Sequence, residues 1–444
     1  MSESSTLPSD STSGLNSPSS KSRRLLIVGA VIVAIVAVGA VVKITGGIGG
    51  SRAGTIAAKS EEPNNSRIAS GTDHTCTIRD DATVWCWGWN FSSQLARNIT
   101  SPAYSSTPIQ VPPSQVSGAQ SVAAGDGHTC ALLANSQVKC WGDGDGGQLG
   151  NGIMLDAVNP VSVMDSRGPD GAPFEDVEAI AAGRKHTCAL KTGGTVWCWG
   201  DNRFSQMGLP ESNVGEEQFT PRIVSKLDSV VAISAGGDTT CALLSDTSVK
   251  CWGSNNDGVL GIGTYRVTSS ETPLNVVRSE TDNRALNNVV AISVGDNHTC
   301  ILDASRHASC WGYNGTGQLG NNPALGTTAF ASKSAPVRVD SDEEFSTISA
   351  GGFHTCAILE STKAVQCWGN NNKGQLGDGT TKNRDRPVAV SGDGNANVEL
   401  ALGARFSCSL ASNAAIRCWG LNDHGELGNG TTNDRDTAGY VIFD

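Results

Sequence analysis

The chain has 444 residues, enough for two or three ordinary domains or for one large repetitive domain. It contains 53 glycines and 14 cysteines, and its formal net charge is −11. Residues 1–66 carry more Lys and Arg than Asp and Glu, so the net negative charge comes entirely from the rest of the chain. Such an acidic body repels phosphate backbones, which argues against general binding of DNA or RNA.

The first 66 residues predict a tail, an anchor and a linker. Residues 1–24 are rich in Ser, Thr and Pro without an apolar periodicity, which is typical of a disordered cytoplasmic tail. Residues 25–42 are an uninterrupted apolar run that, as a transmembrane helix, extends about 27 Å and matches the hydrocarbon thickness of a bilayer. Residues 43–66 contain mostly Gly, Ser, Ala and Asn and predict a flexible stalk.

Two interpretations of the apolar run remain open, and both export the rest of the chain. The bases Lys21, Arg23 and Arg24 precede the run and favour a cytoplasmic N-terminus. We expect an uncleaved signal anchor in the cell membrane, because the polar leader is long and the apolar run exceeds the usual core of a signal peptide. Cleavage near Gly39 and Ala40 would instead release a secreted protein.

Seven copies of one sequence unit follow the stalk. In each copy two cysteines stand ten residues apart, or eleven in one copy, and Trp-Gly follows the second cysteine. The first cysteines recur every 52 to 59 residues, which indicates a repeat architecture. The pairs are Cys76 with Cys86, Cys130 with Cys140, Cys188 with Cys198, Cys241 with Cys251, Cys300 with Cys310, Cys356 with Cys367, and Cys408 with Cys418.

Each copy contains four short segments that predict strands. They are bounded by Gly, Asn, Asp or Ser, as strands usually are. In the second copy they are residues 107–111, 119–125, 128–133 and 137–142. Seven copies of four antiparallel strands predict an all-β, seven-bladed β-propeller over residues 67–444, preceded by the transmembrane helix. No Pro-containing strand precedes the first copy, so we expect residues 439–444 to complete the first blade and close the ring.

The cysteine spacing favours disulfide bonds over metal sites. In a hairpin with a central turn, residues i and i+10 face each other at a distance that a disulfide can bridge. A Cys pair with one His leaves zinc a ligand short. In an exported chain we therefore predict seven disulfides, one within each copy. The extra residue between Cys356 and Cys367 requires a longer turn or a bulge.

A histidine two residues before the first cysteine recurs in five copies and is predicted to be structural. These histidines are His74, His128, His186, His298 and His354. Thr239 and Phe406 take this place in the fourth and seventh copies, whereas a residue of a single catalytic site would not be copied and then lost twice. We predict that each histidine bonds to the backbone of its blade. The GxGxxG matches at Gly142 and Gly315 open no helix, so no dinucleotide or other cofactor is predicted.

The repeated unit, with HTCAL, CWG and GQLG as its most constant pieces, resembles the regulator of chromosome condensation repeat. The resemblance covers residues 67–444 and implies a seven-bladed propeller. The founding nuclear member of that family is a nucleotide-exchange factor for a small GTPase and binds chromatin. We do not expect that role here, because this body is acidic and exported. The resemblance implies instead a bacterial type of surface protein with paired cysteines.

These observations predict a membrane-tethered, extracytoplasmic protein-interaction module without catalytic activity. No hydrolase, metalloprotease or phosphate-loop motif is present, and no cysteine remains for nucleophilic chemistry. The Cys-to-Cys hairpins and the connections after the Pro-containing strands are expected on one face. Because these connections vary in length, as the linkers on the opposite face also do, whereas the hairpins hardly vary, we expect an unidentified partner to bind around residues 164–176 and 278–288.

The candidate binding residues are Trp89, Trp197, Arg167, Asp170, Phe174, Glu280, Asp282 and Arg284. Three alternatives remain. The variable loops are tolerated insertions without a partner, or the propeller binds carbohydrate or cell wall through Trp89 and Trp197, which lie outside the CWG triplets. The third is guanine-nucleotide exchange, as in the founding member of the family.

Overall fold

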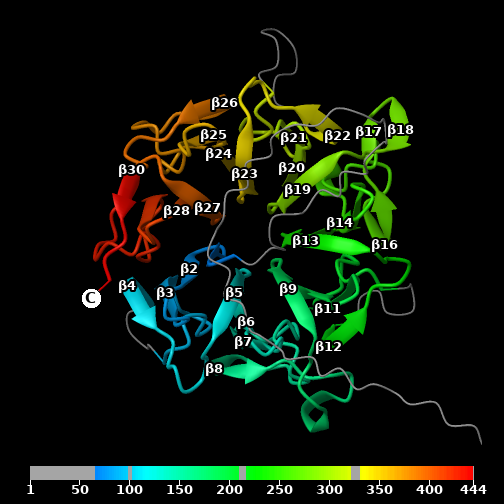
Figure 1. Ribbon diagram of the computed structural model, residues 1–444, viewed down its shortest axis with the longest axis vertical. Coiled ribbons are helices and arrows are strands. Elements are labelled where there is room, and N and C mark those ends of the chain that lie inside the picture. Colours follow the sequence, from blue (N-terminus) through cyan, green and yellow to red (C-terminus); the bar gives the residue numbers. More distant parts are fainter. Residues whose placement is uncertain (1–65, 99–102, 210–216, 322–330, 444) are drawn as a thin grey trace, which may run out of the picture. The chain divides into compact units, whose positions relative to one another are not determined.

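The seven repeated units fold into seven four-stranded antiparallel sheets, the blades of a β-propeller, as predicted (Figure 1). The computed structural model describes residues 66–98, 103–209, 217–321 and 331–443, which belong to one unit of the chain, Lys59–Asp444. The predicted tail (1–24), anchor (25–42) and all but the last residue of the stalk (43–66) lie outside the described residues. Within the described ranges, no helix has the length and apolar character needed to cross a membrane.

The strands of each blade follow one another in sequence from the central channel outward. The first, innermost strands are β1 (Ile68–Ser70), β5 (Ala119–Ala124), β9 (Val177–Ala182), β13 (Val230–Gly236), β19 (Val289–Val294), β23 (Phe345–Ala350) and β27 (Asn397–Leu402). The second strands are β2 (His74–Ile78), β6 (His128–Leu133), β10 (His186–Lys191), β14 (Thr239–Leu244), β20 (His298–Asp303), β24 (His354–Leu359) and β28 (Phe406–Ala411).

The third and fourth strands complete the blades. The third strands are β3 (Val84–Trp89), β7 (Val138–Gly142), β11 (Thr195–Gly200), β15 (Val249–Ser254), β21 (Ala308–Gly312), β25 (Val365–Gly369) and β29 (Ile416–Gly420). The fourth, outermost strands are β4 (Tyr104–Gln110), β8 (Ala157–Ser162), β12 (Gln218–Ile223), β16 (Ser269–Asn275), β22 (Lys333–Arg338), β26 (Arg384–Ala389) and β30 (Arg435–Tyr440). A small hairpin, β17 (Val277–Ser279) and β18 (Asp282–Ala285), and two short 3-10 helices, η1 (Gly168–Asp170) and η3 (Asn256–Gly258), lie in the loops.

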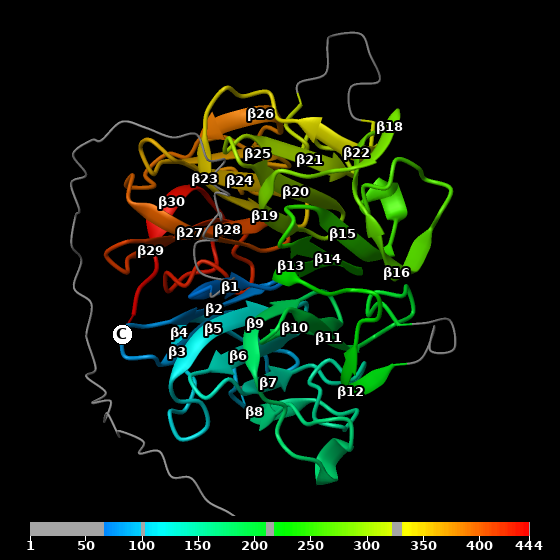
Figure 2. The same cartoon turned by 45° about the vertical axis from the view of Figure 1, so that its right-hand side comes forward.

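The hydrophobic core lies between the blades. Each second strand is buried almost throughout, as in β6, because neighbouring blades cover both faces of the sheet. The tryptophan of every CWG triplet is completely buried. Trp141 of blade two, for example, packs with Ile78 and Leu95 of blade one. The first strands lie next to one another around the channel, from β1 to β27 (Figure 2).

The C-terminal strand belongs to blade seven, and the prediction that residues 439–444 complete blade one is wrong. In β30, Gly439 and Tyr440 pair with Cys418 and Arg417 of β29. Blade one has its own fourth strand, β4, which contains Pro108. Each Pro-containing strand therefore ends a blade as its outer edge, where the missing N–H of proline breaks no sheet hydrogen bond.

The ring closes by packing between blades seven and one. Trp87 Nε1 of blade one donates a hydrogen bond of 2.8 Å to the Glu426 carbonyl of blade seven. Phe443, just beyond β30, packs edge-on against Trp85 and Trp87 at centroid distances of 5.8 and 6.3 Å. The C-terminus accordingly lies beside blade one in both views (Figures 1 and 2).

Strand direction sorts the loops onto two faces. The turn face carries the turns between first and second strands and the loops between third and fourth strands; in blade one these are residues 71–73 and, of the loop that follows β3, residues 90–98 and 103. The hairpin face carries the Cys-to-Cys hairpins and the connections between blades, residues 79–83 and 111–118 in blade one. This alternation confirms the predicted grouping of the loops.

Candidate functional site

All seven predicted disulfides are present, each joining the second and third strands of one blade. The paired cysteines face each other in the strand register, and their Cα atoms are 4.1 Å apart in every pair. The bonds join Cys76 to Cys86, Cys130 to Cys140, Cys188 to Cys198, Cys241 to Cys251, Cys300 to Cys310, Cys356 to Cys367, and Cys408 to Cys418. The predicted pairing is therefore confirmed at every position, and the disulfides fix the middle of every blade.

The pair with the additional residue keeps the same geometry as the other six. In blade six the register runs without a bulge from the Cys356 and Cys367 pair to the Ile358 and Val365 pair. Of the two predicted alternatives, a longer turn therefore accommodates the extra residue.

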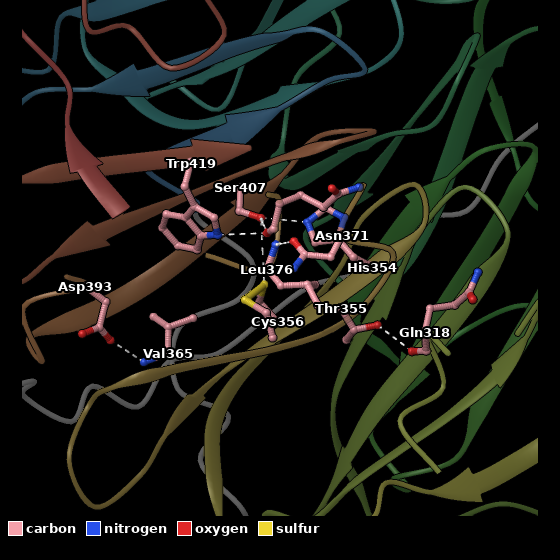
Figure 3. The surroundings of a disulfide bond; sticks show 12 residues. Gln318, His354, Thr355, Cys356, Val365, Asn371, Leu376, Asp393, Ser407 and Trp419 are labelled. Atoms are coloured by element: carbon pink, nitrogen blue, oxygen red, sulfur yellow. Dashed lines mark hydrogen bonds between the residues drawn. A yellow bond between two sulfur atoms is a disulfide. The ribbon is translucent and has the colours of Figure 1, made fainter. Parts of the chain in front are cut away.

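A set of side-chain hydrogen bonds that recurs at most of the interfaces joins neighbouring blades, as Figure 3 shows for one of them. Between blades six and seven, His354 Nε2 lies 2.8 Å from Ser407 Oγ. Ser407 Oγ donates to the Gln375 carbonyl at 2.8 Å, and Trp419 Nε1 donates to the same oxygen at 2.9 Å. Because the hydroxyl has only one proton to donate, the histidine must supply the proton of its own bond, which assigns the neutral tautomer protonated at Nε2.

The five histidines all use this bond, and the prediction that they bond to backbone is wrong. Their partners are hydroxyl groups of the following blade, because the ring lies across the interface between blades. The pairs are His74 with Thr129, His128 with Thr187, His186 with Thr240, His298 with Thr355, and His354 with Ser407. Burial lowers the pKa to about 3 for four of these histidines and to about 4 for His186, so they are neutral at physiological pH.

The indole bond between blades gives a prediction with an internal control. Trp141 Nε1 donates to the Gln94 carbonyl at 2.8 Å, whereas the equally buried Trp252 Nε1 has no hydrogen-bond partner among the described residues. Both Trp141→Phe and Trp252→Phe remove similar apolar area. We expect Trp141→Phe to lower the free energy of unfolding by about 1 kcal/mol more than Trp252→Phe, as measured by urea titration. Equal losses would contradict a stabilising role for the indole bond.

Three candidate residues of the loop before blade three do not form an open binding surface. Phe174 is only 5% exposed and packs edge-on against Trp197, with ring centroids 5.7 Å apart. Lys191 Nζ lies over both rings. Phe174 is therefore a core residue, and Trp197 is half-buried beside it. Arg167 is exposed but pairs with Asp165 at 2.6 Å, while Asp170 is exposed at the end of η1.

The second predicted loop folds into the β17–β18 hairpin, whose charged groups are already paired. Arg284 Nη2 lies 2.6 Å from Asp282 Oδ2. Glu280 Oε1 accepts hydrogen bonds from the backbone N–H and the hydroxyl of Ser334 in blade five, at 3.1 and 3.2 Å. Figure 1 shows this hairpin at the rim, next to β22.

Trp89 lies apart from the other candidates, because it ends β3 on the turn face. Its ring stacks on Phe91, with centroids 6.1 Å apart and planes at 14°. The His424 ring lies 4.0 Å from the Trp89 centroid, and Tyr104 also approaches His424. The structure therefore does not bring the predicted set together.

An apolar surface on the turn face was not predicted from the sequence. Of the twelve large hydrophobic side chains that are exposed among the described residues, eight belong to the loops between third and fourth strands, or to the start of the fourth strand, in blades one to four. We call these eight the apolar arc: Phe91, Ile153, Met154, Leu155, Phe204, Phe219, Tyr265 and Val267. Exposure ranges from 37% for Phe219 to 76% for Phe91. In the sequence, the run of three apolar residues at 153–155 was the feature that could have indicated this exposed apolar surface.

Hydrogen bonds hold the loops that carry the apolar arc. In blade one, Asn90 Oδ1 accepts from the N–H of Leu95 at 2.9 Å, and blades three to seven repeat this bond. The loop of blade two is also tied to blade three, since Gly152 N donates to the Phe219 carbonyl at 2.8 Å. Gly147 has a φ of +79° and approaches Phe219 so closely that a Cβ atom would lie 2.7 Å from the ring. These loops therefore present their side chains on a fixed backbone.

The central channel is lined by the first strands and by the turns that follow them. Turns of neighbouring blades donate backbone hydrogen bonds around the channel, for example Arg184 N to the Gly237 carbonyl at 2.7 Å. The cavity that these turns and the first strands line is partly open to solvent and has a volume of about 190 Å³. At its mouth Arg184 lies 3.6 Å from Asp126 and 3.4 Å from Asp238, and burial raises the pKa of Asp296 to about 6. No group of three or more His, Cys, Asp or Glu side chains suited to a metal ion occurs in the described part of the chain.

Comparison with known families supports the resemblance seen in the repeated unit. The profile of the RCC1-like domain matches residues 165–441. Two profiles of the regulator of chromosome condensation (RCC1) repeat match residues 66–94 and 119–148, and residues 81–132 and 137–190.

Curated relatives include receptors and much larger ligases. The ultraviolet-B receptor UVR8 of Arabidopsis thaliana is 27% identical over 377 residues, which cover 83% of this chain and 80% of UVR8. The E3 ubiquitin-protein ligase HERC2 of Homo sapiens is 27% identical over 73% of this chain. The human probable E3 ubiquitin-protein ligase HERC6 is 30% identical over 75% of it. The aligned regions cover only 6% of HERC2 and 32% of HERC6.

Solved structures share the fold. Human WBSCR16 superposes with a TM-score of 0.68 at 19% identity, covering 81% of this chain and 94% of that one. Prp20p of Saccharomyces cerevisiae superposes with a TM-score of 0.64 at 22% identity, covering 78% and 83%. The repeated unit, the seven blades and the family profile agree, and the chain therefore belongs to the RCC1-like domain family.

Proposed function

We propose that this chain is a protein-binding module without catalytic activity, tethered to the outer side of a membrane by residues 25–42, and that its partner binds the turn face. The apolar arc is the observation that carries the proposal. Exposed apolar side chains gathered on one face of a soluble domain are typical of interaction surfaces. Since hydrogen bonds already order the loops, binding would lose little conformational entropy.

The entry point of the chain is compatible with such a tether. Ser66 and Arg67 precede β1 on the hairpin face, where Ile78 N donates to the Arg67 carbonyl. A tether attached before residue 66 would join the propeller on that face. The apolar arc, on the turn face, would remain accessible to a partner.

Propellers of the same fold bind proteins, which supports the proposal that this chain binds a protein. Prp20p was solved in a study of its binding to Gsp1p and histones, and also in complex with Kap60. We propose protein binding for this chain as well, while the partner differs because the body is acidic and, as we propose, exported.

Paired surface variants of the full chain test the binding face. Phe91→Ser, Leu155→Asp and Phe204→Ser combined should abolish cross-linking to a cell-surface partner that the wild type captures. Ile223→Asp is the matched control, since Ile223 is 49% exposed on the hairpin side of blade three, and it should leave capture unchanged. Each interfacial aromatic or aliphatic anchor is expected to contribute about 1–3 kcal/mol.

A second pair of variants tests the hairpin face that the sequence favoured. Arg167→Ala and Arg284→Ala should not reduce capture, because both guanidinium groups are paired within their own loops. Loss of capture in these variants, with full capture by the arc variant, would move the binding surface to residues 164–176 and 278–288 and refute the turn face.

Carbohydrate binding is the second candidate function, and the Trp89–Phe91 stack favours it. The stack presents a flat aromatic face, because Phe91 is 76% exposed and Trp89 supports it from below. Trp197 offers no such platform, since it is packed against Phe174. Binding to a glycan array that Phe91→Ala abolishes and Trp197→Phe preserves would support this function over protein binding.

A further inference from the structure

The interface between blades seven and one, which we call the closure seam, differs from the other six. Phe406 occupies the position of the histidine, so the histidine bond is missing here, as it is between blades four and five, where Thr239 takes this position. Thr75 Oγ1, the hydroxyl that such a histidine would contact, instead bonds to Ser70 Oγ of its own blade at 2.9 Å. Among the described strands, none passes from one of these blades to the other. Side-chain packing and a few polar contacts therefore hold the closure seam.

Glu426 places a carboxyl group in the closure seam where five other blades have glutamine. In blade six, Gln375 Oε1 accepts from the N–H of Lys373 at 2.8 Å. Glu426 Oε2 takes the same place and accepts from the N–H of His424 at 2.9 Å. The Glu426 side chain is 0% exposed, and its Oε1 lies 3.3 Å from His424 Nδ1 without a hydrogen bond. Its carbonyl accepts the Trp87 bond that joins the two blades.

A second carboxyl group crosses the same seam. Glu399 Oε2, on β27, accepts from the backbone N–H of Arg67 at 2.8 Å and from Ser66 Oγ at 3.2 Å. At the same register position of the first strand, blades two to six have neutral residues. These are Ser121, Ala179, Ala232, Ala291 and Thr347. A fully buried acid, Glu426, and a half-buried one, Glu399, at these two positions are thus a property of the closure seam.

We infer that the closure seam is a pH-sensitive lock: it holds blades seven and one together when Glu426 is protonated and loosens when Glu426 ionises. The reason is desolvation, since an ionised carboxylate buried between two blades lacks water and sufficient donors. Loosening here opens the ring locally, because the chain does not cross this seam within any described sheet.

The surrounding charges set the direction of the effect. Burial, together with the charges of Asp73 and Asp423, raises the pKa of Glu426 to about 7, while His424 is the adjacent base. Burial also raises the pKa of Glu399, opposed by the bonds from Arg67 and Ser66. A carboxyl group with a raised pKa stabilises the fold below its unfolded value of 4.5, and that stability is lost as the pH rises through about 7.

Hydrogen exchange of the oxidised full chain tests the lock. Comparing wild type with Glu426→Gln at the same pH cancels the intrinsic exchange rate. At about pH 8 we expect amides of residues 84–89 and 416–428 to exchange up to about 100-fold more slowly in Glu426→Gln, and at about pH 5 the two proteins should differ by less than about fivefold. Glu426→Gln introduces the side chain that the other blades use, so the fold is expected to persist.

Gln375→Glu is the matched gain-of-function variant. It moves the carboxyl group to the seam between blades six and seven, which keeps its histidine bond. Compared with wild type at the same pH, this variant should exchange faster there at about pH 8 and differ by less than about fivefold at about pH 5, so the contribution of His354 cancels. Equal exchange of wild type and Glu426→Gln at both pH values would overturn the inference. So would a pH-dependent opening of the same size at all seven seams.

Discussion

Acidification to about pH 4.5 is expected to destabilise the oxidised propeller by roughly 2–3 kcal/mol for each of the five inter-blade histidines, of order 10 kcal/mol together. Burial lowers their pKa to about 3 or 4, whereas an unfolded histidine has a pKa of 6.5. The stability that they contribute is present above pH 6.5 and is lost as the pH falls toward the folded value. Buried acids such as Glu426 and Asp296 oppose part of this change.

Urea unfolding between about pH 7 and pH 4.5 measures the effect, and His354→Phe isolates one histidine. Phe406 fills the equivalent position of blade seven, so phenylalanine is compatible with the fold there. The variant should lose stability at pH 7, because Ser407 loses its partner, but its stability should fall with acid by roughly one fifth less than that of the wild type. An unchanged pH dependence would show that protonation of these rings is not the cause.

Removal of the disulfides is expected to have an effect of comparable size. Each bond joins cysteines ten or eleven residues apart, and the loop-closure model gives about 2.5–3 kcal/mol for such a ring. Seven independent rings make the reduced chain unstable at moderate temperature, because a domain has only about 5–15 kcal/mol to lose.

Variants that lack the disulfide of one blade, or of two blades, measure how much a single disulfide contributes to the free energy of unfolding. Cys130→Ser with Cys140→Ser should lower the free energy of unfolding by about 2–3 kcal/mol, since both sulfurs are fully buried in blade two. Adding Cys300→Ser and Cys310→Ser in blade five should double the loss, because the two blades are not neighbours in the ring. If the variant with Cys130→Ser and Cys140→Ser unfolded at the same midpoint as the wild type, this would contradict a stabilising role for the disulfide of blade two.

The repeat spacing predicted most of the fold, because it carries local geometry. Ten-residue spacing between cysteines determined the hairpin register, and recurrence of the unit determined the number of blades. The sequence did not show which of the four strands of a repeat begins a blade. A repeating series of strands has the same order along the chain whichever strand is taken as the first of the blade. The loop after each CWG triplet looked like a connection between blades because it is long. In the structure, bonds such as Asn90 to Leu95 fold this loop back so that the next strand joins the same sheet.

The candidate surface was harder to predict than the fold. Loop length indicated residues 164–176 and 278–288, but length does not show whether a side chain is already paired, as Arg167 and Arg284 are. Exposure in the apolar arc depends on where neighbouring blades lie, which no single repeat contains. The histidine partners were missed for the same reason, since each hydroxyl lies more than fifty residues away in the sequence.

The confinement of every disulfide to one blade has a consequence for how such a chain can change its size. Gaining or losing a whole repeat alters the cysteine number by two and leaves no orphan thiol. In an inserted blade, the hydroxyl and the indole that bond across the interface would find the backbone carbonyl that the preceding blade provides, as Ser407 and Trp419 find that of Gln375. Duplication of a repeat would therefore yield a chain that still oxidises correctly, with its adaptation confined to the rim loops and to the one junction where the circle is sealed.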